Sequence, residues 1–178
     1  NSSIRTVELS NLGSGSLFYR ALPIPPAGQD DFGYYWRDSE MPDGPAFNWI
    51  DITTIGQPVN FSDQDNGNSG TKYLGFNFDY YGRSVNRFRF CVNGWASFMN
   101  AVFNNWENLT IPDQSYPNDL MAVWWDDLTL ADGGQIYYYT NNADTAIITW
   151  NNVADTRRAG TYTFQIILAA PSTVKYQY

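Results

Sequence analysis

The chain has 178 residues, a formal net charge of −8 and no histidine. Without an imidazole it lacks the usual zinc and copper ligand and any Ser-His or Cys-His nucleophile pair, so the composition favours a binding or structural module over an enzyme. The acidic charge and the lack of a basic stripe argue against nucleic acid as a partner. No apolar run is long enough to predict insertion into a membrane.

Residues 1–28 are predicted to form an extended N-terminal arm. Two short strands, 4–9 and 17–22, flank a Gly/Ser-rich stretch and are followed by a proline-rich one. Such an arm is a candidate donor strand that packs on its own domain or on a neighbouring copy. Its candidate assembly residues are Ile4, Val7, Leu9, Leu17 and Tyr19.

Residues 29–178 are predicted to form one domain. From residue 47 onward, apolar side chains alternate with polar ones in short runs that Gly, Asn and Asp turns separate. This pattern predicts an all-β, antiparallel, jelly-roll-like β-sandwich. The expected strands lie at 74–80, 88–92, 120–125, 135–140, 145–150, 161–168 and 174–176, and a short helix fits 101–108.

Several motifs occur together in a familiar order. They are the run from Phe88 to Phe98 around Asn93-Gly94, the apolar-Trp-Asp run 120–128, and the strands 135–139, 147–153 and 161–168. With 31–34 and 44–52, this order resembles nidogen-type extracellular domains, in a variety found in large secreted bacterial proteins. The resemblance covers about residues 30–178 and implies a non-catalytic β-sandwich at the cell surface or outside the cell. Cys91 and the arm depart from the family pattern.

The acidic clusters are candidate calcium sites. Asp63, Asp65, Asn66 and Asn68 offer hard oxygen ligands in one tight loop, although a solvated turn explains the same residues. Asp126 and Asp127 follow two tryptophans. If the strand continues through them, one carboxylate faces inward and pairs with Arg87 or Arg89 on another strand, or binds Ca²⁺. A structural salt bridge or a turn at the strand end is the favoured interpretation of these two residues.

The aromatic residues are the second group of candidates, because they exceed what one inward-facing layer uses. Tyr34, Trp36, Trp95, Trp106 and Tyr138 are candidates for contact with a sugar face or a protein partner, and core packing is the alternative. Three sequons make Asn1, Asn60 and Asn108 candidate glycosylation sites. Cys91, the single cysteine, is expected to be inert or a surface thiol.

Two functions follow from these observations. The first is a non-enzymatic, extracellular structural or adhesive module that contacts copies of itself or another surface protein, in its sharper form a filament subunit joined by strand donation. The alternative is a calcium-dependent carbohydrate-binding accessory domain of a larger secreted hydrolase. Apart from Ca²⁺, no cofactor is expected.

Overall fold

The computed structural model describes residues 28–42, 44–99 and 103–178. The five candidate assembly residues of the arm, Ile4, Val7, Leu9, Leu17 and Tyr19, lie outside the described residues, as does Asn1. The chain divides into two compact units, one ending at Ala46 and the other spanning Phe47–Tyr178, and each is treated by itself.

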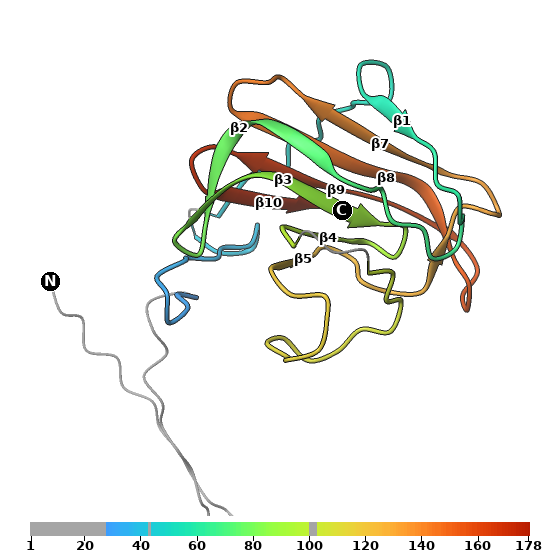
Figure 1. The fold of residues 1–178 in the computed structure, drawn as a ribbon, viewed down its shortest axis with the longest axis horizontal. Helices are drawn as coiled ribbons and strands as arrows, with labels where there is room; N and C mark the ends of the chain where they lie inside the picture. Colours follow the sequence, from blue (N-terminus) through green and yellow to red (C-terminus); the bar gives the residue numbers. More distant parts are fainter. Residues whose placement is uncertain (1–27, 43, 100–102) are drawn as a thin grey trace, which may run out of the picture. The chain divides into compact units, whose positions relative to one another are not determined.

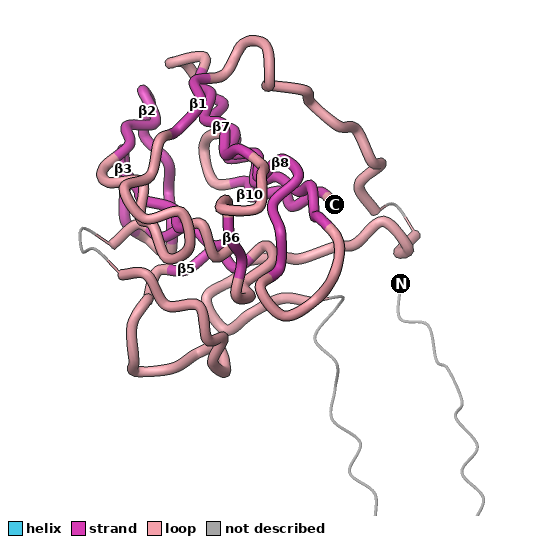
Figure 2. Tube along the Cα trace, turned by 90° about the vertical axis from the view of Figure 1, so that its right-hand side faces the viewer, coloured by secondary structure: helices cyan, strands magenta, loops and turns pink. Residues whose placement is uncertain are grey.

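The second unit is built from strands and loops, and no described residue belongs to a helix (Figures 1 and 2). Each strand expected from the alternation is present, but the expected strand 88–92 begins earlier, at Arg83, the strand 145–150 continues to Asp155, and the strand 120–125 ends at Ala122. The short β1 and β6 were not expected. The strands are β1 (Gln57–Val59), β2 (Lys72–Tyr80), β3 (Arg83–Cys91), β4 (Trp95–Ser97), β5 (Leu120–Ala122), β6 (Leu128–Thr129), β7 (Gln135–Thr140), β8 (Thr145–Asp155), β9 (Thr161–Ala169) and β10 (Thr173–Gln177).

The strands form two antiparallel sheets. The six-stranded sheet has the order β1-β7-β8-β9-β10, with β6 pairing to the far end of β8. The four-stranded sheet has the order β2-β3-β4-β5. In Figure 1 the two sheets lie as separate layers, so the predicted β-sandwich is confirmed.

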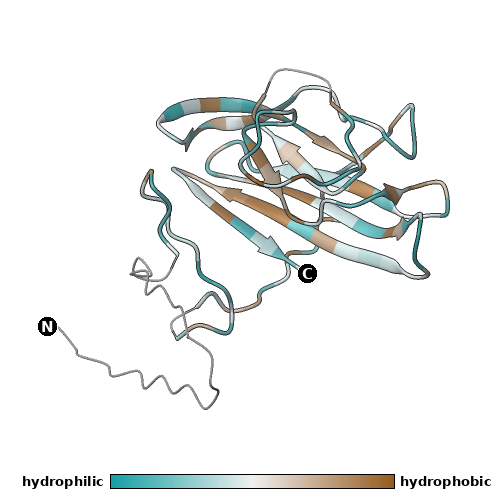
Figure 3. Cartoon of the chain, turned by 90° about the horizontal axis from the view of Figure 1, so that it is seen from below, coloured by the Kyte–Doolittle hydropathy of each residue, from teal (hydrophilic) through white to brown (hydrophobic). Residues whose placement is uncertain are grey.

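The core lies between the two sheets and is rich in aromatic side chains. In β3 the buried Phe88 and Phe90 alternate with Arg87 and Arg89, which is the period of two expected for a half-buried strand. The rings of Trp150 (β8) and Phe164 (β9) stack with centroids 5.1 Å apart. The same alternation appears as brown and teal bands along the strands in Figure 3.

The outer face of the six-stranded sheet is partly covered by the segment before β1. Ile52 is fully buried there against Ile147 of β8 and Ile167 of β9. Burial on both faces explains why β8 and β9 are apolar through much of their length and do not strictly alternate.

The predicted helix at 101–108 is wrong for the part that the structure describes. Residues 103–108 are irregular, and 101–102 lie outside the described residues. This stretch belongs to the long connection between β4 and β5, where Pro112 and Pro117 leave little room for a regular helix.

The first unit is held by local hydrogen bonds. The Oδ1 atom of Asp30 accepts the backbone N–H groups of Phe32, Gly33 and Tyr34 at 3.1, 2.8 and 2.8 Å. The backbone N–H of Trp36 donates to the carbonyl of Gly28 at 2.9 Å, which closes a small hairpin-like turn.

Candidate functional site

The connection between β4 and β5 contains a loop, residues 103–117, that we call the contact loop. Its first two carbonyls accept side-chain amides from the body of the sandwich. Asn68 Nδ2 donates to the carbonyl of Phe103 at 2.8 Å, and Asn93 Nδ2 donates to that of Asn104 at 3.3 Å. These bonds fix the backbone without involving the loop's own side chains.

The third carbonyl of the contact loop accepts two tryptophan N–H groups. Trp95 Nε1 and Trp125 Nε1 both donate to the Asn105 carbonyl, at 2.9 and 3.0 Å. The two indoles are buried with Cys91 in a small cluster separate from the main core. Burying an indole requires a partner for its N–H, and this carbonyl supplies it.

Beyond these fixed points the contact loop exposes apolar side chains. The exposed fractions are 43% for Trp106, 39% for Leu109, 64% for Ile111 and 50% for Tyr116. The Tyr116 ring stacks on Phe103 with centroids 4.5 Å apart, which joins the two ends of the loop. The loop is therefore ordered and presents apolar surface to solvent.

Asn93 connects three segments beneath the contact loop and is fully buried. Its Nδ2 also donates to Asn66 Oδ1 at 2.9 Å, and its Oδ1 accepts the backbone N–H of Leu128 at 3.0 Å. The sequence predicts this residue only as part of an Asn-Gly turn between two strands. The turn is confirmed, with Gly94 at φ +73°, but nothing in the local pattern shows that the asparagine side chain points inward.

The residues of the candidate calcium loop use several of their oxygens within the chain. Asp63 Oδ1 accepts the N–H groups of Asp65 and Asn66 at 2.9 and 3.0 Å. The Oδ1 of Asn66 accepts Asn93, and that of Asn68 accepts the N–H of Gly70 at 3.1 Å. This is the hydrogen bonding of a tight turn.

The structure brings the two acidic clusters near each other. Partial burial raises the pKa of Asp65, and the negative charges of Asp127 and Asp63 raise it further. Within the described part of the chain, no three acidic, cysteine or histidine side chains form a group suited to a metal ion. Calcium binding by Asp63, Asp65, Asn66, Asn68, Asp126 and Asp127 stays a prediction.

The expected partners of Asp126 need correction. β5 ends at Ala122, so the strand does not continue to Asp126, and the arginines beside it are Arg157 and Arg158 rather than Arg87 or Arg89. The Arg158 Nη1 atom lies 3.0 Å from Asp126 Oδ2 and 3.2 Å from Asp155 Oδ2. These ion pairs attach the connection between β8 and β9, which carries both arginines, to the segment that follows β5.

The candidate aromatic residues fall into two groups. Trp95 and Tyr138 are only 1% and 7% exposed, so the expectation that they present ring faces to a ligand is corrected: the contact loop covers Trp95, and Tyr138 faces the core. Trp106 is exposed on the contact loop. In the first unit Trp36 is 58% exposed, and Tyr34 is half-buried with its ring against Phe32.

Two of the candidate glycosylation sites lie in the described part of the chain. Asn60 and Asn108 are exposed, and Asn108 Nδ2 donates to the carbonyl of Trp125 at 3.1 Å.

Cys91 is fully buried, and burial raises its pKa to about 12. A thiol of that pKa stays protonated and unreactive at neutral pH, in line with the inert thiol that was one of the two expectations.

No helix among the described residues is long and apolar enough to cross a membrane. Comparison with curated proteins finds no match, and comparison with solved structures finds none. The family described as NIDO related matches residues 44–178, which include both sheets and the contact loop. The nidogen-type resemblance is thereby confirmed, and such domains are generally non-catalytic modules of the extracellular type. The chain belongs to the NIDO-related family.

Proposed function

We propose that this chain is a non-enzymatic adhesive module that contacts a second copy of itself through the contact loop, residues 103–117. The observation that carries the proposal is the ordered display of Trp106, Leu109, Ile111 and Tyr116 on a backbone held by side-chain donors from the body of the sandwich. Contiguous apolar side chains exposed on a protein surface mark sites of interaction with other proteins.

The hydrogen bonds to the first three carbonyls of the loop support a binding role. A loop that is ordered before binding loses less conformational entropy when a partner arrives. Its tryptophan and tyrosine also belong to the residue types that contribute most to protein interfaces. A second copy is the partner we favour, because most soluble assemblies are homo-oligomers.

Charge affects such a contact in a measurable way. The chain has a net charge of −8, so two copies repel each other at low ionic strength. Salt screens this repulsion, while the apolar contact does not depend on it. Self-association through the contact loop is therefore expected to strengthen as salt is raised from low to moderate concentration.

Sedimentation velocity over a concentration series tests the proposal. The double variant Trp106→Ser/Ile111→Ser is expected to be monomeric at concentrations where the unaltered chain associates. A matched control, Ile55→Ser/Tyr178→Ser, removes one aliphatic and one aromatic side chain that are 58% and 62% exposed elsewhere. A chain that stays monomeric at every concentration and salt level, or a control that loses association equally, overturns the proposal.

Strand donation by residues 1–28 is a second route to the same assembly. It is supported by the sequence of the arm alone, and its candidate residues lie outside the described part of the chain. Deleting residues 1–22 separates the two routes. Donation requires the deletion to abolish association, whereas a contact made by the loop survives it.

A further inference from the structure

The register between β2 and β3 contains a large irregularity. Tyr73 pairs with Arg87 and Phe78 pairs with Val85, so the four residues 74–77 of β2 face the single residue Asn86 of β3. The longer strand must bow outward to accommodate the extra residues. We call residues 74–77 the β2 arch.

The β2 arch is held in place by the other sheet. Tyr138 Oη of β7 donates to the carbonyl of Tyr73 at 2.7 Å, and Thr140 Oγ1 donates to that of Leu74. Gly75 has φ +84°, and a Cβ there would lie 2.7 Å from Cα of Asn142, so only glycine fits this close approach. The arch is thus a built feature with fixed geometry.

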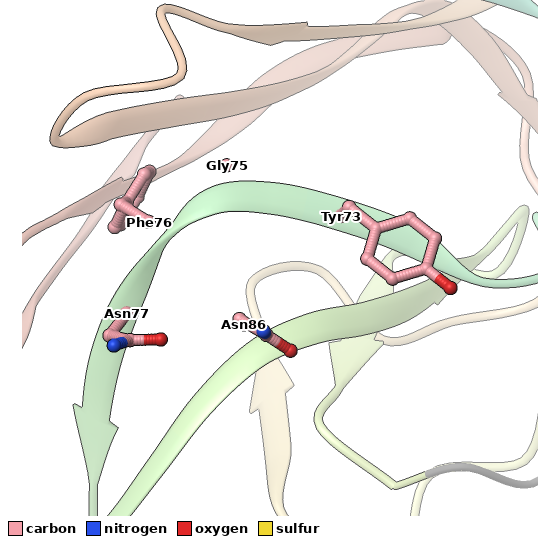
Figure 4. A pocket seen from close by; sticks show the side chains of 5 residues that line it. All are labelled: Tyr73, Gly75, Phe76, Asn77 and Asn86. Atoms are coloured by element: carbon pink, nitrogen blue, oxygen red, sulfur yellow. The ribbon is translucent and has the colours of Figure 1, made fainter.

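Between the β2 arch and β3 lies a shallow hollow of about 380 Å³. It is lined by Tyr73, Gly75, Phe76, Asn77 and Asn86, and Figure 4 shows the Tyr73 ring and the two amides lying along the gap between the strands. The Tyr73 side chain is 64% exposed although its backbone is fixed. An exposed ring suits the apolar face of a sugar, and amides match hydroxyls because each both donates and accepts hydrogen bonds.

Two arginines extend this surface. Arg87 lies directly opposite Tyr73 and so shares its outward face, and Arg89 follows two residues later on the same face. Across the described residues, neither arginine forms an ion pair. The Nε atom of Arg89 is buried and has no hydrogen-bond partner within the described part of the chain. On a chain of net charge −8, two guanidinium groups that have no ion-pair partner among residues 28–42, 44–99 and 103–178, next to a ring and two amides, form a distinctive set.

We propose that the outer face of β2 and β3 binds an acidic saccharide, a sugar unit carrying a carboxylate or a sulfate. The sugar ring lies on Tyr73, its hydroxyls bond to Asn77 and Asn86, and the anionic group pairs with Arg87, with Arg89 nearby. Guanidinium groups recognise planar or tetrahedral oxyanions through paired N–H donors, which gives the anion specificity. None of the residues that line the hollow belongs to the contact loop, so binding here does not depend on self-association.

Isothermal titration with a galacturonic acid trisaccharide and a heparin-derived tetrasaccharide tests the proposal, with cellotriose as the neutral probe. At least one acidic probe is expected to bind, and cellotriose is expected to bind roughly tenfold or more weakly. Binding should weaken as salt is raised, because the anion–arginine attraction is screened.

Four variants assign the binding to this face. Tyr73→Ala and Arg87→Ala are each expected to lower the affinity for the acidic probe roughly tenfold or more. Tyr73→Phe is expected to retain the affinity because it keeps the ring. Arg157→Ala makes the same change in net charge away from the hollow and should leave affinity unchanged.

Thermal unfolding checks that each variant is folded, which is expected because Tyr73 and Arg87 are exposed. The proposal is overturned if neither acidic probe binds, if cellotriose binds as tightly as both, or if Tyr73→Ala and Arg87→Ala bind like the unaltered chain. Use of the contact-loop variant Trp106→Ser/Ile111→Ser as a further control separates the two proposals, since it should bind the acidic probe normally.

Discussion

The side chain of Gln165 forms two hydrogen bonds with the backbone of Ile50. Its Nε2 donates to the Ile50 carbonyl at 3.1 Å, and its Oε1 accepts the Ile50 N–H at 3.4 Å. Gln165 is fully buried and also accepts Gln177 Nε2 at 2.7 Å. The segment before β1 is not paired with a strand at Ile50. The Gln165 side chain of β9 instead supplies the donor and the acceptor that a neighbouring strand would offer to the Ile50 backbone.

Replacing Gln165 should therefore loosen that segment. Gln165→Leu keeps the side chain buried but leaves the Ile50 peptide and Gln177 without their partners, which is expected to lower the free energy of unfolding by about 1–3 kcal/mol. Urea unfolding measures the loss. The exposed Gln57 provides the control, and a Gln57→Leu variant that is equally destabilised would show that burial of Gln165 is not the cause.

The pairing of Asp126 with two arginines predicts a larger cost than an ordinary surface pair. Asp126 is only 16% exposed at its side chain, although Arg157 and Arg158 are 50% and 58% exposed. Asp126→Asn is expected to lower the free energy of unfolding by about 1–2 kcal/mol, because both arginines lose their charged partner. The cost stays below that of breaking a fully buried pair, because the two arginines are half exposed and keep part of their solvation.

Asp119 offers the matched comparison for Asp126. It pairs with a single arginine, Arg83, at 2.6 Å, its side chain is 30% exposed against 16% for Asp126, and its φ of +50° is well suited to asparagine. Asp119→Asn should cost less than about 1 kcal/mol. Equal losses from the two asparagine substitutions in urea unfolding would contradict the importance assigned to the Asp126 cluster.

The carboxyl group of Asp65 predicts a pH dependence of opposite sign to the usual one. Its pKa is raised in the folded chain by partial burial and by Asp127 and Asp63, so its favourable contribution is present below the unfolded pKa and is lost as the pH rises through the folded pKa. Asp65→Asn is therefore expected to raise the melting temperature slightly at pH 7 and to leave it unchanged at pH 3.

Calcium reverses that expectation, which makes the same variant a test of the predicted calcium site. If the loop binds Ca²⁺, millimolar calcium raises the melting temperature of the unaltered chain and a chelator lowers it, and Asp65→Asn reduces both effects. Identical melting curves with calcium and with chelator would remove the calcium prediction.

Cys91 should be unreactive until the chain unfolds. With a pKa of about 12 and a fully buried sulfur, its thiolate is scarce at pH 8 and has no access to reagent. A colorimetric disulfide reagent is expected to label the native chain slowly and one thiol per chain rapidly in urea. Fast labelling of the native chain would mean that the cluster around Trp95 opens readily.

The sequence predicted what depends on local alternation. The run Gln135–Thr140 was predicted with the bounds that the structure has, because apolar and polar side chains alternate cleanly there and turn residues flank it. The same alternation indicated two sheets with an aromatic core. These features need only the period of two and the chemistry of turns.

The parts that the sequence did not give depend on contacts between distant residues. Trp95 looked like an exposed aromatic residue because its strand does not reveal that a carbonyl ten residues later accepts its N–H. Asp126 forms an ion pair with Arg158, 32 residues later in the chain. The hollow beside Tyr73 exists only because the register between β2 and β3 shifts between Tyr73 and Phe78. Register and loop placement are decided by tertiary packing, which a single sequence does not display.

The donors beneath the contact loop bond to the main-chain oxygens of residues 103–105, and these bonds do not involve the side chains of those residues. Related chains could therefore exchange residues 109–115 for other sequences and keep the same backbone, provided that Asn108 and Tyr116 keep their contacts with Trp125 and Phe103. Because the supporting contacts and most of the exposed side chains belong to different residues, the exposed residues could change their binding specificity without loss of the fold. The loop is therefore a suitable position for grafting a binding sequence.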